Sequence, residues 1–219
     1  MDIDFMQEQL PLYFEAAKIT IYIAAIGILL AVLVGLICSI ARYFKIPVFR
    51  QIAACYIELS RNTPLLIQLF FLYFGLPKLG IVFSSEACAI IGLTFQGGSY
   101  MAEVFRSGLD NVPPVQKESA LALGMKKPQV LRFIILPQAV SNSIPAFCAN
   151  IIFLIKETSV FSAVALADLM FVTKDLIGVY YKTDEALFML VIAYLIILLP
   201  ISILCSLVER RIRYGEYGV

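Results

Sequence analysis

Polar side chains interrupt long apolar runs at three places in this sequence of 219 residues. The interruptions read RNT at 61–63, QGGSY at 96–100 and KETS at 156–159. An arginine or lysine can bind a carboxylate, and hydroxyl or carbonyl oxygens can accept hydrogen bonds from an ammonium group. We therefore expect these stretches to line a pathway for a small polar solute. The candidate side chains are Arg61, Asn62, Thr63, Gln96, Gly97, Tyr100, Lys156, Thr158 and Ser159.

The first two of these stretches also have a structural explanation. Glu58 and Arg61 are three residues apart and can pair on one helix face, and we expect the similarly spaced Glu103 and Arg106 to be a structural pair. The glycine pair at 97–98 can break a helix, as the proline at position 64 can, or it can serve close helix packing. The sequence leaves both explanations open.

The residue types argue against catalysis and metal binding. The chain has no histidine, which is the commonest general base and metal ligand. Its five cysteines lie far apart without a CxxC spacing, so we expect neither a metal site nor a disulfide. The phosphate-binding pattern GxxxxGK(S/T) is also missing. We expect a chain that is not an enzyme, binds no cofactor itself and has no nucleic-acid partner.

The composition indicates an integral membrane protein. The chain is 61% hydrophobic and 15% charged, with a mean hydropathy of +0.89, whereas a soluble domain is about half apolar and about a quarter charged. A helix needs about 20 apolar residues to span a bilayer. We expect an all-α fold with about five spans in one domain, residues 1–219. The spans lie near residues 16–41, 52–74, 87–105, 144–167 and 187–208.

The basic residues predict the orientation. With the N-terminus outside, 11 of the 17 lysines and arginines fall on inner segments, four on outer segments and two inside spans. Because basic residues favour the cytoplasmic side, we predict N-out and C-in. The loop of residues 106–143 is then cytoplasmic, and the three polar stretches lie at similar depth near the bilayer midplane.

The cytoplasmic loop contains a stretch of unusual composition, PPVQKESALALGMKKPQVLRFIILPQ at 113–138. The proline pair at 113–114 suits a helix start, and Gly124 suits a helix end. Pro128 can begin a second, amphipathic helix, which we expect to end at Pro137. The stretch therefore predicts two short helices joined by a tight turn.

This stretch resembles the EAA motif of the permease subunits of binding-protein-dependent ABC importers. That motif reads Glu-Ala-Ala, three residues, Gly, nine residues, then Ile-x-Leu-Pro, and Ser119 is the one departure here. The matching residues are Glu118, Ser119, Ala120, Gly124, Ile134, Leu136 and Pro137. Residues 58–77, 100–109 and 156–160 further resemble the branch for polar amino acids, the histidine, glutamate, glutamine, arginine and opine group.

The resemblance implies a type I importer fold with a cytoplasmic coupling helix that docks in a cleft of an ATPase. Glu118, Ser119, Ala120, Gly124, Leu136 and Pro137 would form that coupling site. The implied assembly contains a second permease subunit, identical or paralogous, and two cytoplasmic ATPase subunits that bind ATP and Mg²⁺. An extracytoplasmic solute-binding protein would deliver the amino acid. The implied location is the bacterial plasma membrane, and the implied mechanism is alternating access.

Two alternatives remain at this point. The chain could be a stand-alone secondary transporter or channel for a small polar solute, although about five spans without an inverted repeat are few for that class. The amphipathic helix pair could also lie on the membrane surface without a partner. Among substrates, arginine, histidine, glutamine, glutamate and cystine all stay open.

Overall fold

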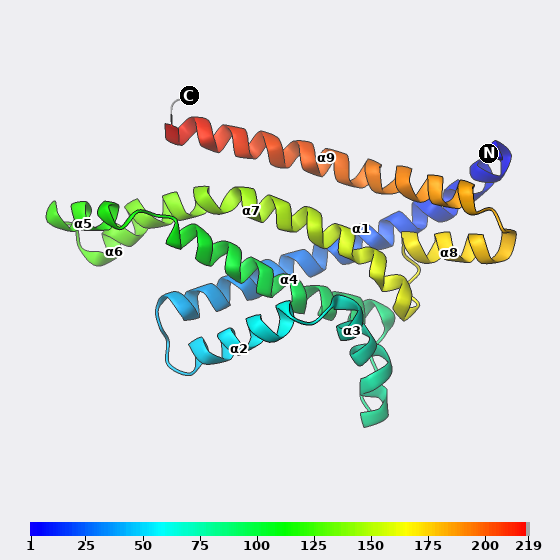
Figure 1. Cartoon of the computed structure of the whole chain (residues 1–219), viewed down its shortest axis with the longest axis horizontal. Helices are drawn as coiled ribbons and strands as arrows, with labels where there is room; N and C mark the ends of the chain where they lie inside the picture. The colour runs from blue at the N-terminus through cyan, green and yellow to red at the C-terminus, as the bar shows by residue number, and fades with distance from the viewer. Residues whose placement is uncertain (218–219) are drawn as a thin grey trace.

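The computed structural model describes residues 1–217 and the side chains of residues 1–212; residues 218–219 of the expected domain lie outside the described part. Long helices run side by side along the long axis of the molecule (Figure 1). The helices are α1 (Ile3–Tyr43), α2 (Phe49–Arg61), α3 (Leu65–Phe70), α4 (Ser85–Asp110), α5 (Pro114–Ala122), α6 (Lys127–Val130), α7 (Leu136–Glu157), α8 (Leu169–Tyr180) and α9 (Thr183–Tyr217). Shorter turns are η1 (Phe71–Gly75), η2 (Leu76–Leu79), η3 (Leu131–Ile135) and η4 (Thr158–Val164).

Close packing of α1 against α4 forms the centre of the structure. Gly27, Ala31 and Gly35 recur every fourth residue and therefore share one face of α1, where all three are buried. A Cβ at Gly35 would lie 2.5 Å from Met101 Cβ and 2.8 Å from the Ala102 nitrogen. Small residues thus let the two backbones approach, as is common between membrane helices.

The second predicted span is broken where the sequence suggested. The helix α2 stops at Arg61, and α3 leaves at a steep angle after Pro64 (Figure 1). The Gln68 side-chain amide donates to the carbonyls of Ser60 and Thr63, at 3.2 and 2.9 Å, and so satisfies groups that the break leaves unpaired. The glycine pair at 97–98, by contrast, does not interrupt α4.

The π-helical turns η1 and η3 each precede a Leu-Pro pair. In η3 the Leu136 N–H donates to the Leu131 carbonyl, five residues back. Because Pro137 has no N–H and its ring would clash with a carbonyl four residues back, a wider turn accommodates it. The expectation that Pro137 ends the helix is therefore wrong, since one helical segment runs from Lys127 to Val164.

In the described part of the chain, three helical segments are long and apolar enough to cross a membrane: Ile3–Tyr43, Lys127–Val164 and Thr183–Ile212. The helix α4 has 26 residues, which is about 39 Å at 1.5 Å per residue, but it carries the polar stretch at 96–100. The segment Leu65–Leu79 is apolar but shorter. The predicted all-α membrane fold is confirmed, whereas the count of five spans and the N-out orientation stay predictions.

The N-terminus is tied to the beginning of α9. Asp2 caps α1 by accepting the Phe5 N–H, and it forms an ion pair of 3.1 Å with Lys182. The Phe5 N–H and then the Lys182 ammonium group hold the pKa of Asp2 below its usual value. Further along α1, the Tyr13 hydroxyl donates to the Ala186 carbonyl at 2.7 Å. The helix α8, which the sequence did not predict, packs beside this junction.

Candidate functional site: a helical hairpin and a polar bundle centre

A helical hairpin made by α5, α6 and η3 extends from one end of the bundle (Figure 1). Its turn is a Schellman motif, in which the Gly124 N–H donates to the Leu121 carbonyl at 3.0 Å and the Met125 N–H donates to the Ala120 carbonyl at 3.1 Å. Gly124 has a φ of +84°, in the left-handed region that side chains other than glycine disfavour. The structure therefore has a tight turn at Gly124, as the sequence predicts.

The hairpin has a small hydrophobic core of its own. Ala120 is 5% exposed and belongs to a cluster with Val112, Val130, Ile135 and Ala139. The small side chain of Ala120 lets α5 lie close to the following helix. Ala120 therefore holds the two arms of the hairpin together and does not present a surface to a partner.

The remaining motif residues divide between the tip and the base of the hairpin. Glu118, Ser119 and Gly124 are exposed on α5 and the turn. Leu136 and Pro137 are also exposed, but they belong to the start of α7, where the hairpin joins the bundle.

The hairpin also exposes apolar side chains that the sequence analysis did not single out. Leu123 is 85% exposed beside the turn, and Val115 is 59% exposed on the same helix. Both side chains are therefore accessible for contact with a partner. The sequence signal for Leu123 is its position directly before a helix-ending glycine, outside the apolar face of the helix.

The polar stretches of α2 and α4 meet at the centre of the bundle. The Arg61 guanidinium lies over the Tyr100 ring, 5.7 Å from its centroid. The Tyr100 ring in turn meets the Phe153 ring of α7 edge-on at 5.3 Å. One residue before Arg61, the Ser60 hydroxyl donates to the Phe95 carbonyl at 2.9 Å. Arg61 and Tyr100 are therefore the predicted pathway residues that the structure brings into direct contact.

Other pathway candidates serve the packing or their own helices. A Cβ at Gly97 would lie 2.8 Å from Ala31 Cβ and 2.9 Å from Leu154 Cδ1, so this glycine lets three helices pack closely. The Asn62 amide and the Thr63 hydroxyl donate to carbonyls four residues back, at 2.7 and 2.9 Å. The Gly97 contacts match the packing explanation, whereas Asn62 and Thr63 form hydrogen bonds back to α2.

Of the four remaining candidates, in α4, α7 and η4, two are buried and two remain accessible. Gln96 is 6% exposed, and its Oε1 has no hydrogen-bond partner among the described residues. Thr158 is fully buried and donates to the Ile155 carbonyl at 2.7 Å. Lys156 is exposed and forms no ion pair within the described part of the chain, and Ser159 is half-buried.

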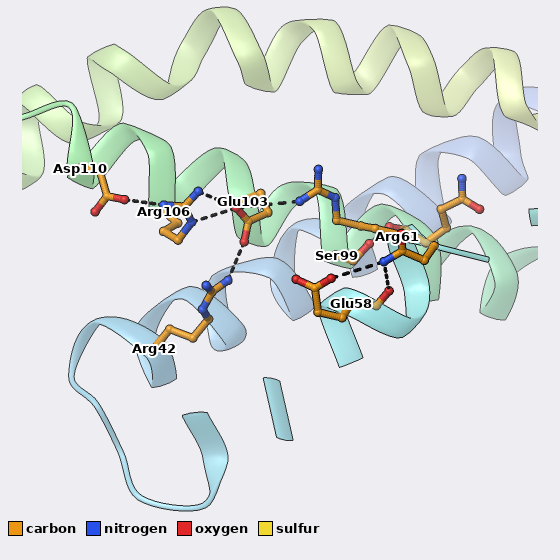
Figure 2. Close-up of polar contacts among 9 residues, drawn as sticks. Arg42, Glu58, Arg61, Ser99, Glu103, Arg106 and Asp110 are labelled. Atoms are coloured by element: carbon orange, nitrogen blue, oxygen red, sulfur yellow. Dashed lines mark hydrogen bonds and ion pairs between the residues drawn. The ribbon is translucent and has the colours of Figure 1, made fainter. Parts of the chain in front are cut away.

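Glu103 is the centre of an ion-pair network that joins three helices (Figure 2). Its carboxylate accepts from Arg42 of α1 at 2.5 Å and from Arg106 at 2.7 Å, while the Arg61 guanidinium of α2 lies 4.0 Å away. Arg106 also contacts Asp110 at 2.5 Å. The expected Glu103–Arg106 pair therefore exists and extends across the bundle.

Arg61 points toward this network, whereas the Glu58 carboxylate accepts a hydrogen bond of 3.3 Å from the Asn62 amide.

Besides Leu123, the sequence analysis missed Asp168, which is fully buried and accepts the Phe171 N–H at 2.9 Å. Its other oxygen has no partner among the described residues. The available signal was an isolated acid within the apolar stretch at 160–172.

Comparisons with known proteins agree on one family. Residues 27–214 match the family described as "Binding-protein-dependent transport system inner membrane component". The "Probable amino-acid permease protein YxeN" of Bacillus subtilis (strain 168) is 37% identical over 96% of this chain and 95% of its own length. The "Probable glutamine ABC transporter permease protein GlnP" of the same organism is 37% identical over 76% of each chain.

A solved structure supports the same assignment at the level of the fold. A chain of "an amino acid ABC transporter with histidines" superposes with a TM-score of 0.91 at 31% identity, covering 96% of this chain and 99% of that one. The family match spans most of the sequence, including the hairpin and the polar bundle centre. This chain is therefore a member of the family of inner membrane components of binding-protein-dependent transport systems.

Proposed function

We propose that this chain is the permease subunit of an ATP-driven importer that moves a polar amino acid across the plasma membrane. The observation that carries the proposal is the ordered hairpin, whose motif spacing and exposed Leu123 suit docking to a cytoplasmic ATPase. Family membership and the printed names of the relatives support it. They weigh against a stand-alone secondary transporter or channel.

The partners follow from what the chain lacks in its sequence. Without a GxxxxGK(S/T) pattern it has no ordinary phosphate cradle, so ATP and Mg²⁺ belong on a separate ATPase subunit. We propose two such ATPase subunits, a second permease subunit and an extracytoplasmic solute-binding protein. The chain itself then supplies the pathway and the mechanical connection.

The connection runs along one helical segment. Lys127, at the hairpin, and Lys156, in the polar KETS stretch, belong to the continuous helical segment Lys127–Val164. The two lysines are 29 residue steps apart, which corresponds to about 44 Å at about 1.5 Å per residue. Closure of the ATPase pair on ATP would draw two hairpins together, and this helix would transmit the displacement to the bundle centre. Hydrolysis would then restore the inward-open state.

The docking proposal is tested by placing a charge on the hairpin tip. Leu123→Glu puts a carboxylate where we expect an apolar contact, so the tagged chain should no longer retain an ATPase on purification from its native membrane. The matched control is Leu79→Glu at the end of η2, outside the hairpin, where the leucine is also largely exposed, at 72%. ATP hydrolysis by the purified complex is the readout.

Loss of the ATPase with both variants would indicate a general defect of folding. Retention with both would remove the coupling role from the hairpin. Only a selective loss with Leu123→Glu agrees with the proposal.

The substrate pathway is a separate part of the proposal. Lys156 is an exposed cation without an ion pair among the described residues, on the helix that connects to the hairpin. We expect Lys156→Met to slow amino-acid uptake in proteoliposomes while ATPase association stays normal. Uptake kinetics identical to those of the unmodified protein would remove Lys156 from the pathway.

A further inference from the structure

Two cavities adjoin at the end of the bundle that carries the hairpin. The first has a volume of about 560 Å³ and lies between α1, α4 and α7, with walls that are almost entirely carbon. Leu36, Ile40, Phe105, Val140 and Phe147 are typical of its lining. The second has a volume of about 350 Å³ and lies between the ends of α1 and α4 and the start of α2. Ser39, Tyr43 and Leu109 line both cavities, so the apolar cavity lies directly beside the polar one.

The second cavity carries an excess of positive charge. Its lining contains Arg42, Lys45, Arg50 and Arg106 but only one acidic residue, Asp110. The nearby Glu103 also pairs with two of these arginines (Figure 2). An excess of two positive charges remains even when both carboxylates are counted. Lys45 and Arg50 form no ion pair within the described part of the chain.

The end of α1 fixes the backbone of Lys45 beside the polar cavity. The helix α1 ends in a Schellman motif, with the Lys45 N–H donating to the Arg42 carbonyl at 3.2 Å and the Ile46 N–H donating to the Ala41 carbonyl at 3.0 Å. Lys45 occupies the left-handed position, with a φ of +52°. The same position at the end of α5 is glycine, Gly124.

We propose that the two cavities form one binding site for an anionic phospholipid. The acyl chain would lie in the apolar cavity, and the phosphate would contact Lys45 and Arg50, with Arg42 and Arg106 beside them. Basic pockets between membrane helices recognise anionic head groups in this manner. The apolar chain of such a lipid matches the apolar cavity, and its negative head group matches the basic cavity beside it.

A second copy of this chain fits the site less well. A helix from another copy could fill the apolar cavity, but it would have to bring negative charge to the polar one. The helix α9 brings two exposed arginines, Arg210 and Arg211, near its end. Like charges would therefore meet in the polar cavity, and this disfavours such a contact.

The proposed lipid would also touch the base of the hairpin, because Leu131 and Leu136 line the apolar cavity. Bound lipid would thereby stabilise the connection between the hairpin and α7. This inference needs only the membrane location of the chain, so it can fail or hold independently of the proposed amino-acid transport.

The test measures the thermal unfolding of the full chain, purified with its associated subunits in detergent, as lipid is added. We expect phosphatidylglycerol to raise the unfolding temperature, whereas phosphatidylcholine and inorganic phosphate should not. In the double variant Lys45→Gly/Arg50→Gln, binding of phosphatidylglycerol should weaken about twenty-five-fold, because each basic residue near an anionic head group contributes about a factor of five. Without lipid this variant should be no less stable, since Lys45→Gly relieves the strained φ.

The matched control is Lys78→Gln, which removes an exposed lysine on η2, outside both cavities, and should keep the full response. Equal effects of the two lipids, or an unchanged response in the double variant, would overturn the proposal. A response to inorganic phosphate alone would show an ion site without a lipid. Protection that depends on protein concentration and excludes phosphatidylglycerol would place a second copy in the groove instead.

Discussion

The turn of the hairpin can be strained without any steric clash, which makes it a quantitative test of coupling. A Cβ added at Gly124 would have no heavy atom within 4 Å, so a Gly124→Ala substitution acts through its φ of +84° alone. Gly80, which directly follows η2 and lies outside the hairpin, has the same φ of +84°, and a Cβ added there would also have no heavy atom within 4 Å. The two glycines therefore form a matched pair, with only Gly124 in the hairpin.

The left-handed conformation costs a residue with a side chain about 1–2 kcal/mol. A change of this size shifts an equilibrium by about five- to thirtyfold. The Gly124→Ala substitution lowers the population of the correctly folded hairpin, so the affinity for the ATPase should decrease by up to that factor. Gly80→Ala should reduce the stability of the chain similarly but leave ATPase affinity unchanged.

The assay is titration of purified ATPase against each variant in nanodiscs, with uptake measured in parallel. Gly124→Asn is the expected rescue, because asparagine tolerates the left-handed conformation better than other side chains. Gly124→Asp should be worse than Gly124→Asn, since it adds a negative charge to the docking surface. Equal loss of affinity in Gly124→Ala and Gly80→Ala, or no loss in either, would refute the reasoning.

Two further predictions concern the stability of the bundle. Glu103→Gln leaves Arg42 and Arg106 without their shared carboxylate and should lower the free energy of unfolding by about 1–3 kcal/mol, between the values for exposed and buried pairs. A double-mutant cycle with Arg42→Met checks this in denaturant titrations, where purely additive effects would contradict a direct interaction. Gly35→Ala should destabilise the α1–α4 contact by about 1–3 kcal/mol through overpacking. Gly178 lies in α8, and a Cβ added there would have no heavy atom within 4 Å. Gly178→Ala should therefore stabilise the chain by up to about 1 kcal/mol. Thermal unfolding measures both variants, and shifts in the same direction would contradict the packing argument.

The local pattern of the sequence was enough to predict the class of protein and the hairpin. Apolar runs of about 20 residues indicate membrane helices because lipid requires every backbone group to be paired within the helix. Gly124 could be placed correctly because a helix end with a left-handed residue is a local event. The break at Pro64 is local for the same reason, since proline removes a donor wherever it occurs.

Contacts between distant segments could not be predicted in this way. The pattern of α4 alone does not reveal that Gly97 meets Ala31 and Leu154, because these residues come from three different helices. Similarly, the spacing of Glu103 and Arg106 predicts one pair, while the contribution of Arg42 depends on how α1 crosses α4.

What the sequence by itself determined is therefore the membrane class, the family motif and the turn that ends α5. The tertiary structure decided which motif residues face outward. Ala120 lies inside the hairpin while Leu123 lies outside, and the polar residues of α4 divide between packing and accessible surface. The physical reason is that burial depends on the helix that packs against a residue, and that neighbour lies far away in the sequence.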